Sequence, residues 1–114
     1  MAHFEKLAKL GSANAKPVHL FMLAMKGPSR KAFSKAIEAC SEAGMVHLEA
    51  MAKERYASFL LNQEMDTELA NEYITSSYWL YQDWGAHAKA LQLSQQNDFL
   101  KVRILSSFHI YILI

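Results

Sequence analysis

The chain has 114 residues, of which 52% are apolar, and a formal net charge of +1. This length supplies one domain at most, and this apolar content excludes a disordered chain. Four glycines and two prolines are few, which favours long helices over many-turned β-structure. The single cysteine, Cys40, cannot form an internal disulfide, so we expect a reducing compartment and a cytoplasmic location. No run reaches the ~20 apolar residues that a membrane-spanning helix needs.

The small net charge conceals an uneven distribution. Residues 1–37 carry seven Lys and Arg against one acid, a net of +6, whereas residues 38–98 carry ten acids against three bases, a net of −7. A solvated basic face beside an acidic one is the simpler interpretation. A patch that binds a partner or a phosphate is the alternative.

The first predicted elements are two helices separated by a break at Gly27-Pro28. The apolar run 18–25 ("VHLFMLAM") predicts a helix before the break. Pro28 suits the first turn of the next helix, because its missing N–H costs nothing there. That helix ends at Gly44 and has an apolar stripe at helical spacing. The stripe consists of Ala32, Phe33, Ala36, Ile37, Cys40 and Ala43.

Three further helices are predicted, giving about five in all. "VHLEAMAKERYASFLLNQE" carries a second stripe of Leu48, Met51, Ala52, Tyr56, Phe59 and Leu60. Asp66 is a good N-cap for a helix over residues 67–83. Gly85 is expected to end that helix in a left-handed conformation. "AHAKALQLSQQ" has the composition of a short final helix.

Two of the helices share a pattern of small residues. Ala32, Ala36 and Ala39 recur 38 residues later as Ala70, Ile74 and Ser77. Small side chains at such positions let helix backbones approach closely, and helix pairs that recur at this interval are typical of α-solenoids. The sequence therefore predicts an all-α, TPR-like antiparallel helical repeat over residues 18–97, after a basic N-terminal segment (1–17) of uncertain order.

The aromatic cluster in "SSYWLYQDWGAHAKAL" (76–91) is predicted to be a packing seam between the helices on either side of Gly85. Trp84 is expected to be its buried anchor. Trp79 lies one residue off the stripe formed by Ala70, Tyr73 and Ser77 and is expected to be more exposed. The predicted seam comprises Ala70, Tyr73, Ser77, Tyr81, Trp84, Gly85, Ala86 and Lys89.

The apolar tail, residues 98–114, does not share the helical pattern. "KVRILSSFHIYILI" is rich in β-branched and aromatic residues, which favours a strand. A strand without a partner is an aggregation hazard, so we expect the isolated chain to self-associate. One alternative is that this stretch is not natural coding sequence, since Lys-Val-Arg can arise by reading through a splice donor.

No arrangement of residues predicts catalysis or cofactor binding. The five histidines lack metal-ligand spacing, and we expect them to be hydrogen-bonded or exposed. Cys40 lies on an apolar stripe without a partner that would stabilise a thiolate. The carboxylate pairs Glu49/Glu54 and Glu68/Glu72 are expected to be solvated. The glycines form no phosphate loop, and the aromatics lack the interleaved bases of a nucleic-acid groove. We therefore expect neither an enzyme nor a cofactor, metal or nucleic-acid binder.

Residues 18–95 resemble the helical, TPR-like region that follows the AAA-type ATPase domain of large multi-sensor signal-transduction kinases. The matching residues are Ala36, Ile37, Ala39 (adjacent to the family position), Gly44, Glu49, Ala50, Ala52, Glu54, Ala57, Phe59, Ala70, Tyr73, Tyr81, Trp84, Gly85, Ala86, Ala88 and Lys89. The Trp-Gly-Ala-x-Ala-Lys box is the most specific part. Ser77 departs from the usual Ala, and residues 99–114 match nothing in that family.

The resemblance implies a fragment of a scaffold that links an ATPase module to sensory or kinase domains, without the catalytic motifs of either. We therefore expect a non-catalytic chain that makes protein–protein or interdomain contacts. The alternative is a stand-alone small helical bundle that binds a peptide or a partner helix.

Overall fold

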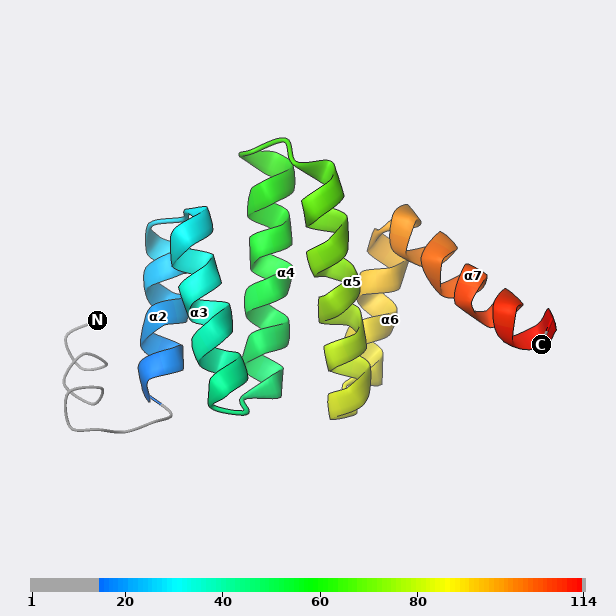
Figure 1. The fold of residues 1–114 in the computed structure, drawn as a ribbon, viewed down its shortest axis with the longest axis horizontal. Coiled ribbons are helices and arrows are strands. Elements are labelled where there is room, and N and C mark those ends of the chain that lie inside the picture. Colours follow the sequence, from blue (N-terminus) through cyan, green and yellow to red (C-terminus); the bar gives the residue numbers. More distant parts are fainter. Residues whose placement is uncertain (1–14, 114) are drawn as a thin grey trace.

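The computed structural model describes the backbone of residues 15–113 and the side chains of residues 15–106. This part of the chain forms six helices and no strand (Figure 1). They are α2 (Ala15–Lys26), α3 (Arg30–Glu42), α4 (Val46–Asn62), α5 (Thr67–Trp84), α6 (His87–Gln96) and α7 (Asp98–Leu113). The predicted all-α class is confirmed, with one helix more than expected.

The helices follow one another along the long axis of the molecule, which measures 53 × 30 × 20 Å (Figure 1). Short turns reverse the chain between successive helices, so each helix packs mainly against its chain neighbours. The α4–α5 pair makes the most extensive contact, and only α2 with α4 and α5 with α7 touch across an intervening helix. The fold is therefore held together by sequentially local interfaces.

Polar caps fix where the helices begin and end. The Ser29 hydroxyl accepts a hydrogen bond from the Ala32 amide (3.0 Å), and Asp66 accepts one from the Leu69 amide (3.2 Å). The predicted Asp66 cap is confirmed, but Pro28 precedes the Ser29 cap and is not in the first turn of α3. Ser29 takes the cap because its hydroxyl can satisfy an otherwise unpaired amide. After α3, Gly44 has a φ of 69° and turns the chain into α4.

The core lies where the stripes of α3, α4 and α5 face one another. Phe33 of α3 stacks on Tyr56 of α4, with ring centroids 5.3 Å apart, and Phe59 meets Phe33 edge-on at 5.8 Å. Tyr73 of α5 covers the other side of Tyr56 at 4.7 Å. A smaller cluster of Phe21, Ala36 and Ala52 joins α2 to this core. Burial of these stripes is the main source of helix stability, since isolated helices of this length are marginal in water.

The strand predicted for the C-terminal stretch is wrong, because residues 98–113 form helix α7. Leu100 is fully buried and Ile104, one turn later, packs against the same core. Two apolar side chains four residues apart are enough to hold a helix against α5 and α6, and tertiary packing overrides β-propensity. Within the described range, no helix combines the length and the apolar character required to cross a membrane.

The left-handed conformation expected for Gly85 is confirmed, since its φ is 95° and its ψ is 6°. The Ala86 amide donates to the Tyr81 carbonyl at 2.8 Å and completes the turn. A Cβ at Gly85 would meet no atom within 4 Å, so the cost of a side chain is backbone strain alone.

We therefore expect Gly85→Ala to lower the free energy of unfolding by about 1 kcal/mol. Gly27→Ala is the matched control, because Gly27 lacks a positive φ and its Cβ would lie 3.8 Å from the nearest atom, an ordinary contact. Urea unfolding of both variants measures the difference. Equal stability of the two variants would contradict the strain argument.

Candidate functional site

The residues of the predicted seam lie mainly between α4 and α5, not between α5 and α6 as expected. Ser77 is fully buried, and its hydroxyl donates a 2.7 Å hydrogen bond to the Ala50 carbonyl of α4. Ala70 and Tyr81 are also buried, and Tyr73 lies against Tyr56 of α4. The small residues of both helices allow this close approach, whereas the contact between α5 and α6 is less extensive.

Glu54 ties three helices together and is not the solvated charge that we expected. It accepts a hydrogen bond from the Tyr81 hydroxyl of α5 (3.0 Å) and one from Lys89 of α6 (3.1 Å). Lys89 also lies 5.9 Å from the centre of the Tyr81 ring, a cation–π distance. Burial raises the pKa of Tyr81, and the negative charge of Glu54 raises that pKa further, so the hydroxyl stays a donor. This contact brings Lys89 into the seam.

A second polar link joins α4 to α5 beside this one. Lys53 pairs with Glu49 at 2.8 Å and donates to the Ser76 hydroxyl at 2.9 Å. The side chains of Lys53 and Glu49 are only 17% and 13% exposed, so the prediction of a solvated Glu49 is also wrong. Buried charges need partners of this kind. Glu68 and Glu72 are exposed, as expected.

The assignment of the two tryptophans is wrong. Trp84, the expected buried anchor, is 55% exposed, whereas Trp79 is 46% exposed. Trp84 is the last residue of α5 and lies opposite the first turn of α4, so among the described rings only that of His47 stacks on it, at 4.5 Å. The buried aromatics of this stretch are Tyr78 and Tyr81. Gly85 is exposed and Ala86 is half-buried.

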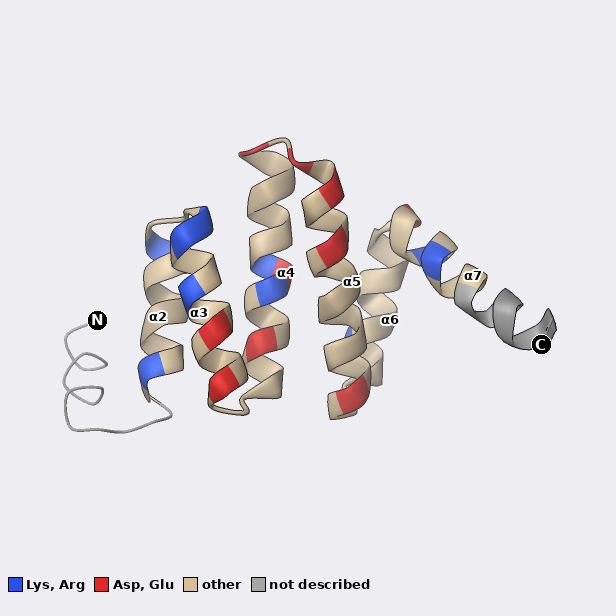
Figure 2. Ribbon diagram, in the orientation of Figure 1, with Lys and Arg blue, Asp and Glu red and all other residues tan. Residues whose placement is uncertain are grey.

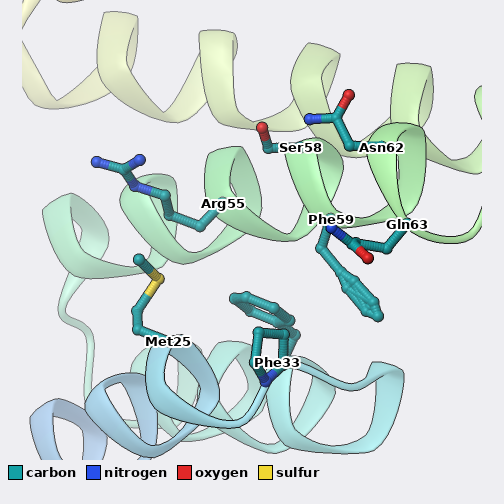
Figure 3. Close-up of a pocket in the computed structure, with 8 residues that line it drawn as sticks. Met25, Phe33, Arg55, Ser58, Phe59, Asn62 and Gln63 are labelled. Carbon is teal, nitrogen blue, oxygen red and sulfur yellow. The ribbon is translucent and has the colours of Figure 1, made fainter.

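An open groove of about 480 Å³ lies between the α2–α3 turn and α4, and we call it the α3–α4 groove (Figure 3). Figure 3 shows Met25 and Phe33 on one side of it and the side chains of α4 on the other. Phe33 is almost fully buried at its base, whereas Met25 is 45% exposed at the rim. The lining residues are Met25, Pro28, Phe33, Arg55, Ser58, Phe59, Asn62 and Gln63.

Arg55 supplies the only charge among the described residues that line this groove. It is exposed and forms no ion pair within the described side chains. Next to the groove, Arg30 bridges from α3 to the α4–α5 turn, reaching Glu64 at 3.3 Å and Asp66 at 3.0 Å. These exposed pairs are expected to add little stability at physiological salt. Figure 2 shows that Lys and Arg gather on α2 and the first half of α3, while Asp and Glu dominate α5 and the α4–α5 turn.

A second groove of about 240 Å³ lies on the other side of α4 and is called the α4–α6 groove. Leu61 is exposed at its rim. Among the described residues that line it, Glu54, held by Tyr81 and Lys89, is the only charged one. Its lining residues are Glu54, Ala57, Ser58, Leu61, Ala70, Asn71, Ile74, Leu93, Gln96 and Asn97. Ser58 lines both grooves. Sequence reasoning missed both, because their lining residues come together only after the helices pack.

The described side chains include no cluster of His, Cys, Asp and Glu that would hold a metal ion. The expectation that the histidines are paired or exposed fails at His19, whose Nδ1 is buried and has no hydrogen-bond partner within the described residues. His3 and His109 lie outside the described side chains. No family model, no curated protein and no solved structure matches this chain.

Cys40 is fully buried in α3, and burial raises the pKa of its thiol from 9.0 to about 11, with a smaller contribution from Glu49. Because the thiolate is the reactive form, we expect iodoacetamide to label the native chain at least about 100-fold more slowly near pH 8 than the chain unfolded in urea. The labelling rate of the unfolded chain should level off above its pKa, while that of the native chain should still rise. Equal rates near pH 8 would contradict the burial of Cys40.

Proposed function

We propose that this chain is a non-catalytic protein-interaction module of the helical-repeat kind, in which the α3–α4 groove receives a segment of a partner protein. The observation that carries the proposal is the groove itself. Two aromatic side chains, Phe33 and Phe59, meet inside an open hollow. Its rim holds the amides of Asn62 and Gln63 and Arg55, which has no ion-pair partner among the described side chains. Peptide-binding sites combine apolar anchors with a few polar groups in this way.

The TPR-like repeat is part of this proposal. It is supported by packing mainly between chain neighbours and by the small residues that recur at an interval of 38, of which Ala36 and Ile74 are both buried. Repeat proteins are built in this quasi-one-dimensional way and bind partners on extended surfaces. A place beside the ATPase domain of a sensor kinase remains a proposal that rests on the sequence resemblance alone.

A peptide selection on the full chain tests the proposed function. Random peptides of about 12 residues are displayed on phage and selected, and the affinity of the recovered sequences is measured by fluorescence anisotropy. We expect saturable binders whose affinity falls at least about tenfold on Met25→Glu, because this change replaces an apolar contact at the rim of the groove by a charged side chain.

The matched control is Leu91→Glu, which makes the same charge change at an exposed apolar residue that lines neither groove. It should leave the affinity unchanged, and circular dichroism should show that both variants keep their helices. The absence of any saturable binder, or equal losses in the two variants, would contradict the proposed function.

A further inference from the structure

We propose that the partner segment is a single extended peptide that crosses α4 at Ser58, occupies both grooves and places an acidic side chain against Arg55. This inference rests on the proposed function and adds the conformation, the span and the charge of the ligand.

The span follows from the position of Ser58. Its small, exposed side chain lines both grooves, so nothing bulky on α4 separates them at this point. Around Ser58, the exposed face of α4 presents Arg55 and Asn62 to the α3–α4 groove and Leu61 to the α4–α6 groove. Packed helices lie about 8–10 Å apart, and an extended chain rises about 3.3 Å per residue. Roughly three residues are therefore enough to link an anchor in one groove to an anchor in the other.

The conformation follows from the amide side chains along this path. Those of Asn62, Gln63, Asn71 and Gln96 form no hydrogen bond to another described side chain or backbone group. An extended peptide has free N–H and C=O groups that these amides can pair with. A helix satisfies its own backbone groups except at its ends, so its backbone would offer these amides few hydrogen bonds.

The charge follows from the two ionisable residues that line the grooves. Glu54 is already held by the Tyr81 hydroxyl and the Lys89 ammonium group, so it offers little attraction to a basic ligand. Arg55 has no ion-pair partner among the described side chains. A carboxylate on the ligand therefore finds a complementary charge, whereas a Lys or Arg at the same place is repelled.

The span is tested with a peptide of about 12 residues from the selection above, together with its two halves. We expect the whole peptide to bind the full chain at least about tenfold more tightly than either half. Two linked anchors lose translational and rotational freedom only once when they bind. Leu61→Arg should weaken the whole peptide at least about fivefold and leave the half that occupies the α3–α4 groove unchanged. Leu91→Arg, at an exposed leucine outside both grooves, should change neither.

The charge is tested by replacing each Asp or Glu of the peptide by its amide. We expect the amide peptide to bind wild type about fivefold more weakly than the acidic peptide, and to show no such loss of affinity with Arg55→Glu. Lys31→Glu makes the same charge change at an exposed residue outside both grooves and should behave as wild type.

Three outcomes would overturn the inference while leaving the proposed function intact. They are full affinity in Leu61→Arg alongside a loss in Met25→Glu, equal binding of the acidic and amide peptides, and a bound peptide that is helical by circular dichroism. If Met25→Glu also has no effect, the proposed function fails with it.

Discussion

Tyr81→Ala is expected to lower the free energy of unfolding by about 3–5 kcal/mol, the range for truncating a large buried aromatic side chain. The Tyr81 ring is 1% exposed and lies in the core that α4 and α5 share. Its hydroxyl also donates to Glu54, so its removal leaves a half-buried carboxylate with Lys89 as its only side-chain partner among the described residues. Loss of packing and loss of a charge-assisted hydrogen bond therefore act together.

Tyr81→Phe separates the loss of packing from the loss of the hydrogen bond, and Trp84→Ala tests which aromatic residue anchors the seam. Tyr81→Phe keeps the ring and removes the donor, so it should cost about 1.5–3 kcal/mol. Trp84→Ala, three residues later, should cost about 1 kcal/mol, because Trp84 is 55% exposed and has one ring contact, with His47. Urea unfolding of the three variants gives the ranking. A larger loss for Trp84→Ala than for Tyr81→Ala would mean that the tryptophan anchors the seam after all.

Leu60→Ala is expected to lower the free energy of unfolding by about 2–5 kcal/mol, since it opens a cavity in the core that α4 shares with its neighbours. Leu60 is 0% exposed, whereas its neighbour Leu61 is 46% exposed. The matched change Leu61→Ala should stay within about 0.5 kcal/mol of wild type. Similar losses in the two variants would contradict the orientation of α4 and, with it, the position of both grooves.

Much of the fold could be predicted from local signals. Most of the stripes of α3 and α4 and the roles of Asp66 and Gly85 are encoded within a few residues, and the structure places them as predicted. Ala43 and Trp84, which also fit the predicted stripes, are exposed. Helix α7 could not be predicted this way, because its apolar residues have high β-propensity. The contact of Leu100 and Ile104 with the rest of the core favours a helix there.

The candidate site could not be predicted from the sequence, because its residues meet only after the helices pack. Glu54 lies 27 residues from Tyr81 and 35 from Lys89, and a carboxylate on a helix gives no sign of such distant partners. Trp84 fits the same helical stripe as Ser77 and Tyr81, but the stripe does not reveal that α4 offers only its first turn at that level. The burial of Trp84 depends on where it lies along α4, and this position cannot be read from the residues around Trp84.

The most direct test of a protein-binding face across α4 is an NMR titration of the ¹⁵N-labelled full chain with a selected peptide. We expect the largest amide shift changes around Arg55, Ser58 and Asn62 on one side of α4 and around Leu61 and Asn71 on the other. The outer residues of α6, such as Leu91, should not shift. Changes confined to α6 and α7, or spread evenly over all six helices, would contradict a binding face centred on α4.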